Sequence, residues 1–274
     1  MATSTSARID LAYLRQRKAQ GRKFAMLTAY DHPTAVAAQS AGVHSLLIGD
    51  SMGCVLLGHQ NTRGVPLDLM ITLGEAVRRG APHVYLVGDV PYQSMVGGHD
   101  AVLEAARRFR EQAGCDAVKF EADTGHEALV TRLAEAGFET IPHIGLLPQT
   151  VTSPEGYRAQ ARDESGIKRL VANARRFVDA GAVMLLLEAV PNEASEAVVS
   201  AVDVPVIGCG AGPACDAHVC VTYDMLGLGG IRPPRFVPVL ADVGETMQTA
   251  MRRWVQDIES QTYPAPQHVY GMKK

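Results

Sequence analysis

The segment AVKFEADTGHEALVTRLAEAGFETIPHIG, residues 117–145, holds the pattern that decides the fold. Two short apolar runs, AVKFEA (117–122) and ETIPHIG (139–145), enclose an Ala-rich, charged stretch that ends near Gly137. Runs this short are typical of strands, and their nearly continuous apolar character indicates a parallel sheet covered by helices. A glycine just before the next run suits the left-handed residue that ends a helix. The segment therefore predicts a strand, a helix and a second strand.

The same unit recurs along most of the chain. The other apolar runs are FAMLTAY (24–30), HSLLIGD (44–50), VYLVGDV (84–90), AVMLLLEAV (182–190), VPVIGCGA (204–211) and HVCVTYDML (218–226). Glycines also precede several runs, namely Gly42, Gly80, Gly114 and Gly181. Eight strands alternating with helices favour a (β/α)8 TIM barrel, with a doubly wound open sheet as the alternative. We expect one domain over residues 1–274, with an N-terminal helix near 9–20 and a C-terminal helix plus a tail from Thr262.

Three local signals predict where helices begin. Thr72 and Glu75 have the spacing of a capping box. Pro33 suits a first helical turn after Asp31 or His32. Asn192 is a candidate cap for the helix that follows the sixth run.

The charge balance restricts the class of partner. The chain has 274 residues, 26 basic and 29 acidic side chains, and a formal charge of -3. Without clustered Lys and Arg we expect no nucleic-acid or membrane partner, and a small molecule instead. The start MATSTSARID lacks the features of a signal peptide, so a cytoplasmic location is expected. Five cysteines without a C-x-x-C motif predict neither a disulfide framework nor a zinc site.

Acidic and histidine side chains stand at the C-terminal ends of the predicted strands, where a barrel brings them to one mouth. They are Asp31 or His32, Asp50, Asp89, Glu121, His143, Glu188 and Asp224, and the glycine-rich turn 208–212 completes the set. Asp31 and Asp224 are interpreted first as a helix cap and a turn former. The remaining carboxylates would repel one another unless a cation or a proton offsets them. Oxygen ligands of this kind favour Mg²⁺ or another hard divalent ion.

Individual residues suggest roles around that ion. Glu188 follows the apolar run MLLL, which would raise the pKa of its carboxyl toward that of a general acid or base. Lys119 shares a strand face with Glu121 and could neutralise a substrate carboxylate. His143 is either a core side chain or a site residue. The hydroxyl of Ser51 could hold an anionic oxygen.

These patterns predict a metal-dependent enzyme whose substrate carries an anionic oxygen, and they favour an α-keto acid as that substrate. The long segments 51–70 and 146–166 follow strand ends and are expected to act as substrate loops. The glycine-rich turn 208–212 is a candidate phosphate cradle.

At the same residues the sequence resembles the ketopantoate hydroxymethyltransferase family. The motifs that carry the resemblance are TAYD (28–31), LLIGDSMG (46–53), GH (58–59), RRGAP (78–82), VKFE (118–121), HIGLLPQ (143–149), GYRAQ (156–160), LLLEAVP (185–191) and PVIGCGAG (205–212). The resemblance implies a barrel of the phosphoenolpyruvate mutase and isocitrate lyase type that forms a homodecamer. It implies Mg²⁺, and transfer of a hydroxymethyl group from 5,10-methylenetetrahydrofolate to 3-methyl-2-oxobutanoate, giving 2-dehydropantoate for pantothenate synthesis.

The resemblance also implies roles for individual residues. Asp50 and Asp89 would bind the metal, with Glu121 in its shell, and Glu188 would be the proton acceptor. The keto acid would contact Asp50, Ser51, Asp89, Lys119 and His143. The stretches 59–70, 95–100 and 212–218 depart from the family's usual forms, which leaves folate contacts and loop closure open.

Two other functions stay open from the sequence. Another enolate-forming lyase of the superfamily is expected to carry a K-K-C-G-H type loop, which this sequence lacks. A non-catalytic barrel that senses a metabolite would be expected to have lost Asp50, Asp89 or Glu188, and all three are present.

Overall fold

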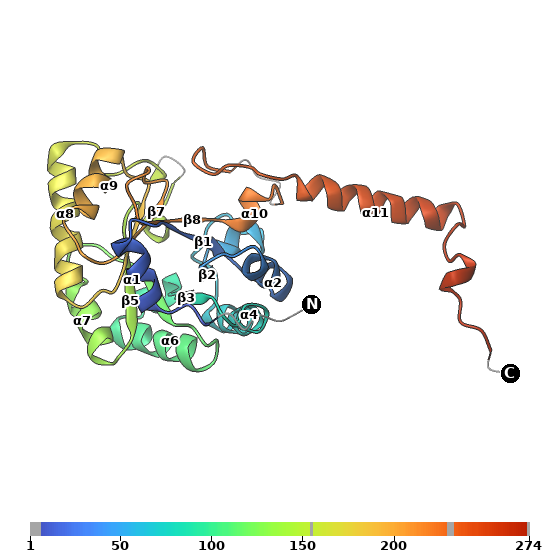
Figure 1. Ribbon diagram of the computed structural model, residues 1–274, viewed down its shortest axis with the longest axis horizontal. Helices are drawn as coiled ribbons and strands as arrows, with labels where there is room; N and C mark the ends of the chain where they lie inside the picture. The colour runs from blue at the N-terminus through green and yellow to red at the C-terminus, as the bar shows by residue number, and fades with distance from the viewer. Residues whose placement is uncertain (1–6, 154–155, 229–232, 273–274) are drawn as a thin grey trace. The chain divides into compact units, whose positions relative to one another are not determined.

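The computed structural model describes residues 7–153, 156–228 and 233–272 (Figure 1). Eight parallel strands close into a barrel in chain order, and β1 pairs with β8. Their bounds are β1 Phe24–Thr28, β2 Ser45–Ile48, β3 Tyr85–Asp89, β4 Ala117–Glu121, β5 Glu139–Gly145, β6 Leu185–Glu188, β7 Val206–Cys209 and β8 Ala217–Cys220. The predicted TIM barrel is confirmed, and the alternative of an open doubly wound sheet is wrong.

Helices connect the strands and cover the barrel (Figure 1). They are α1 Leu11–Ala19, α2 His32–Ser40, α3 Met52–Val55, α4 Leu67–Gly80, α5 Tyr92–Val96, α6 His99–Glu111, α7 Glu127–Glu135, η1 Pro148–Thr150, α8 Glu164–Asp179 and α9 Asn192–Val199. The predicted long segments 51–70 and 146–166 correspond to long connections after β2 and β5, which end at residues 66 and 163, where α4 and α8 follow. Residues 154 and 155 of the predicted loop 146–166 lie outside the described residues.

Asp31 caps α2 as the sequence predicts. Its Oδ1 accepts the backbone N–H of Thr34 at 2.7 Å, and Pro33 occupies the first turn. This contact satisfies one of the helix's unpaired N–H groups, so Asp31 has a structural role.

Two other predicted helix starts are wrong. Because α4 begins at Leu67, Thr72 lies inside the helix, where its hydroxyl donates to the carbonyl of Asp68 at 3.0 Å. Asn192 is the first residue of α9, and Pro191 is the N-cap. In both places the chain enters the helix through a proline, whose fixed φ favours that entry.

The predicted glycine signals are mostly confirmed. Gly42, Gly114, Gly137 and Gly181 have positive φ angles, which residues with a Cβ rarely adopt. Gly80 is the exception, because it is the last residue of α4. A Cβ at Gly80 would lie 2.6 Å from the carbonyl oxygen of His32, so this glycine serves the close approach of α4 to α2.

The N-terminal end of the barrel is closed by α1. Leu14 of this helix is fully buried in the barrel's core cluster. The strand residues of the cluster are Phe24, Met26, Leu47, Tyr85, Val87, Ala117, Ile141, Leu186, Ile207 and Ala217. Apolar side chains fill this end of the barrel, and the polar residues at the C-terminal ends of the strands lie at the opposite end.

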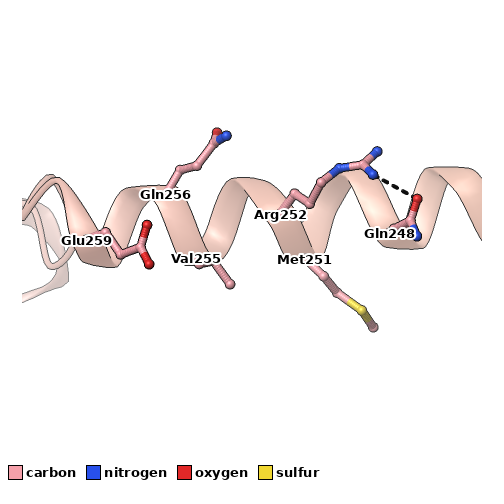
Figure 2. A pocket seen from close by; sticks show the side chains of 6 residues that line it. All are labelled: Gln248, Met251, Arg252, Val255, Gln256 and Glu259. Carbon is pink, nitrogen blue, oxygen red and sulfur yellow. Dashed lines mark hydrogen bonds between the residues drawn. The ribbon is translucent and has the colours of Figure 1, made fainter.

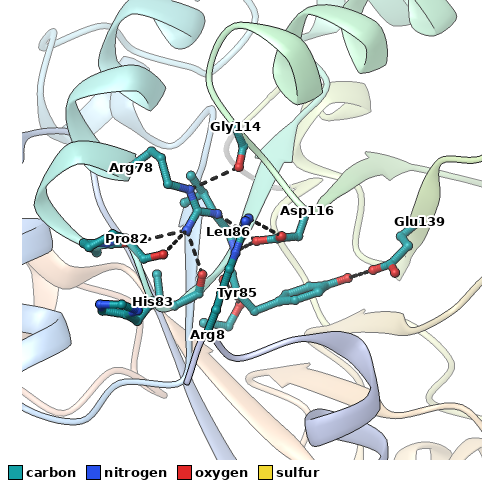
Figure 3. Close-up of polar contacts among 12 residues, drawn as sticks. Arg8, Arg78, Pro82, His83, Tyr85, Leu86, Gly114, Asp116 and Glu139 are labelled. Carbon is teal, nitrogen blue, oxygen red and sulfur yellow. Dashed lines mark hydrogen bonds and ion pairs between the residues drawn. The ribbon is translucent and has the colours of Figure 1, made fainter. Parts of the chain in front are cut away.

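A polar network surrounds Asp116 at the same N-terminal end (Figure 3). Its carboxylate accepts hydrogen bonds from Arg8, from Arg78 at 2.7 Å and from the backbone N–H of Leu86 at 2.8 Å. Arg78 also donates to the carbonyls of Gly114 and Val84 among others. The network fixes the starts of β3 and β4, at the end of the barrel opposite the C-terminal ends of the strands.

Residue contacts divide the chain into two compact units, 1–222 and 223–274. The second contains most of α10 Thr222–Met225, then α11 Val243–Glu259 and η3 Pro266–His268. The predicted run 218–226 is therefore only partly a strand, and Asp224 lies in α10 rather than at a strand end. The single domain expected over 1–274 stays a prediction.

Helix α11 presents an apolar face within its own unit. Met247, Met251, Trp254, Val255 and Ile258 are all exposed. Met251 and Val255 also line a shallow hollow shown in Figure 2, where Arg252 donates to Gln248 at 2.8 Å. No helix among the described residues has the length and apolar character needed to span a membrane.

Candidate active site

Three carboxylates predicted to bind a metal lie buried at the C-terminal end of the barrel. Asp89 and Glu121 are the last residues of β3 and β4, and Asp50 stands two residues after β2. Their exposed fractions are 6% for Asp50, 1% for Asp89 and 5% for Glu121. The backbone N–H of Asp50 donates to Asp89 Oδ2 at 3.1 Å, which ties the first two together.

Lys119 is the cation of this group. It is 5% exposed and lies beside Asp89 in the β3–β4 register, and its Nζ donates to Asp89 Oδ2 at 2.9 Å. Burial alone lowers the pKa of the Lys119 ammonium, but Asp89 and the other two carboxylates outweigh burial and raise that pKa. The lysine is therefore a fixed positive charge inside the barrel, as the strand pattern predicts.

Two of the carboxylates, Asp89 and Glu121, lie in surroundings that resist their ionisation. Burial raises the pKa of Asp89 to about 7, although Lys119 opposes this shift. Burial raises the pKa of Glu121 to about 8, and Asp50 and Asp89 add to the shift by like-charge repulsion. When all three acids are ionised, Lys119 balances only one of the negative charges, so a bound cation would favour the ionised forms.

Glu188 and His143 form the other side of the mouth. His143 is 1% exposed, and its Nε2 lies 3.3 Å from Glu188 Oε2. Burial lowers the pKa of His143, and the charge of Lys119 lowers it further, so the imidazole is neutral. Neither ring nitrogen has a hydrogen bond of ordinary geometry among the described residues.

The side chain of Glu188 is 18% exposed and faces His143. The expected apolar surroundings of this carboxylate stay a prediction. Cys209 lies beside it in the β6–β7 register. Burial and then the charge of Glu188 raise the pKa of the Cys209 thiol well above its ordinary value, so this cysteine is a poor nucleophile.

Ser51 lies next to Asp50 at the start of α3, and its Oγ shares a 2.8 Å hydrogen bond with Tyr30 Oη. The predicted turn 208–212 begins within β7 and continues past its end, and a Cβ at Gly212 would lie 1.9 Å from Asn192 Oδ1. Its predicted role as a phosphate cradle stays a prediction.

Comparisons with known proteins identify the family of this chain. Residues 8–266 match the family model described as ketopantoate hydroxymethyltransferase. The chain belongs to the ketopantoate hydroxymethyltransferase family. It is a hydroxymethyltransferase, as the names of its relatives also indicate.

Two relatives of the ketopantoate hydroxymethyltransferase family show the extent of the likeness. The 3-methyl-2-oxobutanoate hydroxymethyltransferase of Geobacillus kaustophilus is 38% identical, covering 98% of this chain and 95% of the relative. The enzyme of the same name from Bacillus subtilis is 37% identical over 96% of this chain and 95% of the relative.

Solved structures resemble this family member in fold. A phosphonopyruvate hydrolase in complex with oxalate and Mg²⁺ has a TM-score of 0.61 at 13% identity, covering 96% of this chain and 92% of that one. A 2,3-dimethylmalate lyase of the PEP mutase/isocitrate lyase superfamily has a TM-score of 0.60 at 17% identity, over 93% and 89%. At these identities the likeness supports the barrel alone.

The donors at this mouth fit a hard divalent cation. Asp89 Oδ1 is buried and has no hydrogen-bond partner among the described residues, so one carboxylate oxygen is available for a ligand. Within the described residues no three His, Cys, Asp or Glu side chains already enclose a metal position. Mg²⁺ commonly takes one or two carboxylates and keeps several waters, so two aspartates suffice.

Sequence reasoning missed Gln149. It is 2% exposed, and its backbone N–H donates to both carboxylate oxygens of Glu121, at 2.9 and 3.1 Å. Its side-chain Nε2 donates to Asp50 Oδ2 at 2.9 Å and to the carbonyl of Val90 at 3.1 Å. Gln149 closes the motif HIGLLPQ at 143–149, so its place in a predicted substrate loop was the available signal.

Proposed function

We propose that this chain transfers a hydroxymethyl group from 5,10-methylenetetrahydrofolate to 3-methyl-2-oxobutanoate, forming 2-dehydropantoate on the route to pantothenate. The observation that carries the proposal is the arrangement of buried Asp50, Asp89 and Lys119 at the same mouth as the Glu188 and His143 pair. The names of the relatives, 37–38% identical over nearly the full chain, support the same substrate.

Asp50 and Asp89 would hold Mg²⁺, with Glu121 in its outer surroundings. A divalent cation there would polarise the keto oxygen and so make the adjacent C–H group more acidic. The unpaired Oδ1 of Asp89 and the repulsion among the carboxylates support this assignment.

Lys119 and Ser51 would bind the keto acid. The Lys119 ammonium is a fixed charge that can pair with the substrate carboxylate without leaving Asp89, because an ammonium has three donors. Ser51 offers a hydroxyl beside Asp50. The neutral His143 can donate a hydrogen bond from one ring nitrogen and accept one at the other, so we propose that one of them also contacts the substrate.

Glu188 would act as the base. Its carboxylate accepts the C3 proton, and the electron pair of that C–H bond becomes the enolate. C3 then forms a bond to the one-carbon unit that the folate delivers as an iminium. The bond between that carbon and the folate nitrogen then breaks, one water supplies the oxygen of the new hydroxyl group, and tetrahydrofolate is released.

The test follows exchange of the C3 proton of 3-methyl-2-oxobutanoate in deuterated water with Mg²⁺, first without folate and then with it. Wild type should exchange, and Glu188→Gln should lose about 10²–10⁴-fold in rate while still binding the keto acid. Glu193→Gln, an exposed change on the neighbouring α9, is the matched control.

Neither exchange nor product from well-folded wild type would refute the proposed activity. Retained exchange in Glu188→Gln would instead assign the base to another group. The homodecamer implied by the family resemblance stays a prediction that light scattering of the purified protein can test.

A further inference from the structure

Arg63 connects its own loop to the loop after β5 and to the start of helix α5. It lies in the segment between α3 and α4, one of the stretches that departs from the usual family form. Its Nε donates to the carbonyl of Gln149 at 2.8 Å, and its Nη2 donates to the carbonyl of Val151 at 2.9 Å. Its guanidinium carbon also lies 5.2 Å from the ring centre of Tyr92, in the range of a cation–π contact.

The two carbonyls belong to the loop that follows β5. The ends of this loop are tied to the end of β6, because Leu146 donates to the carbonyl of Glu188 and Gln160 donates to that of Ala189, at 2.9 and 2.8 Å. Between these points lies η1, a single turn of three residues. So short a turn has little stability of its own, and contacts from outside must hold it in place.

Gln149 of this turn is held from both sides. Arg63 binds its carbonyl, while its backbone N–H and its side-chain amide donate to Glu121 and to Asp50. A shift of this residue would therefore remove hydrogen bonds from two buried carboxylates at once. Gln149 thus links the guanidinium of Arg63 to the acids at which the divalent cation is proposed to bind.

We propose that Arg63 is a positioning residue that clamps the β5 loop, and that through Gln149 it fixes Asp50 and Glu121 in the arrangement that binds a divalent cation. This inference rests on the proposed function, which supplies the cation. Arginine suits the role because its planar fork donates two hydrogen bonds in fixed directions and can also stack on a ring. Lysine offers a single point charge and cannot reproduce that geometry.

The test measures binding of Mn²⁺ alone by electron paramagnetic resonance, without keto acid or folate. Loss of a group that orients metal ligands typically weakens metal binding by about 10–100-fold. Because Arg63 acts through Gln149, we expect Arg63→Leu to raise the Kd for Mn²⁺ about tenfold and Arg63→Lys to recover only part of the loss. Arg162→Leu, an exposed arginine at the far end of the same loop, should bind as wild type does.

Two further measurements separate positioning from a general loss of structure. Without metal, the amide proton of Gln149 should exchange about tenfold faster in Arg63→Leu than in wild type, since local opening controls exchange. In a Gln149→Ala background, Arg63→Leu should cause a smaller further loss of Mn²⁺ affinity than in wild type. The contact of Gln149 with Asp50 is then already gone, while its backbone N–H still donates to Glu121.

The outcomes are distinguishable. Failure of wild type to bind Mn²⁺ would overturn the proposed metal site, and the inference with it. Normal Mn²⁺ binding by wild type and by folded Arg63→Leu, within twofold, would overturn the inference alone. Unchanged exchange at Gln149 in Arg63→Leu would overturn the clamp whatever the metal result, and so would full additivity with Gln149→Ala.

Discussion

Glu121→Gln should make the metal-free protein more stable, and increasingly so as the pH rises. The carboxyl of Glu121 is 5% exposed, and its pKa is raised from 4.5 to about 8 in the folded state. Between its unfolded and its folded pKa, this carboxyl is ionised in the unfolded chain and must take up a proton on folding. The fold therefore loses stability as the pH rises through that range. Gln is neutral at every pH and keeps an oxygen that can accept the N–H of Gln149, so it removes only the ionisation cost.

The magnitude follows from the difference between the two pKa values. With about 1.4 kcal/mol for each pKa unit, ionisation of Glu121 costs about 1 kcal/mol near pH 5 and about 4 kcal/mol near pH 8. The variant should therefore gain about 3 kcal/mol over wild type between these pH values, or about 6–12 °C in Tm for a domain of this size. The difference in unfolding free energy between the variant and wild type should grow as the pH rises from the ordinary carboxyl pKa of 4.5 to about 8, and should change little above that pH.

The assay is urea denaturation in EDTA near pH 5 and pH 8, repeated with excess Mg²⁺. Magnesium should stabilise wild type more than Glu121→Gln at the higher pH, because the cation favours the ionised carboxylates. Glu135→Gln, an exposed change on α7, should follow wild type throughout. A wild type in EDTA that is as stable as Glu121→Gln near pH 8 would refute the reasoning that Glu121 is held against its own ionisation.

Two further predictions concern packing and the opposite end of the barrel. At Gly88→Ala the new Cβ would lie 2.4 Å from the ring of Phe109, so we expect a loss of about 1–3 kcal/mol in urea denaturation, which Phe109→Leu should partly restore in the double variant. Equal stability of the single variant and wild type would show that the ring moves freely. Asp116→Ala leaves the half-buried Arg78 without its ion pair and should cost about 3 kcal/mol, while the KM for the keto acid stays unchanged. A changed KM in the folded variant would contradict the separation of the two barrel ends.

The barrel could be predicted because its signals are local. Each strand is a short apolar run. The first seven predicted runs each contain an observed strand, and the last, HVCVTYDML, overlaps most of β8. Helix starts were less predictable, as Thr72 and Asn192 show, since a proline a few residues away or directly before them decided the entry. The contact between Glu188 and His143 could not be predicted, because the two side chains come from neighbouring strands that are far apart in the sequence.

By itself, the sequence determined that eight strands would alternate with helices and that acids would stand at their C-terminal ends, because period and strand-end position are properties of neighbouring residues. The tertiary structure alone decided which atoms meet there. It brought Gln149 from the loop after β5 onto Asp50 and Glu121, and it placed Arg63 behind Gln149. It also decided how strongly burial opposes ionisation of Asp89 and Glu121, since that depends on everything that surrounds a carboxylate in space and on very little that precedes or follows it in the chain.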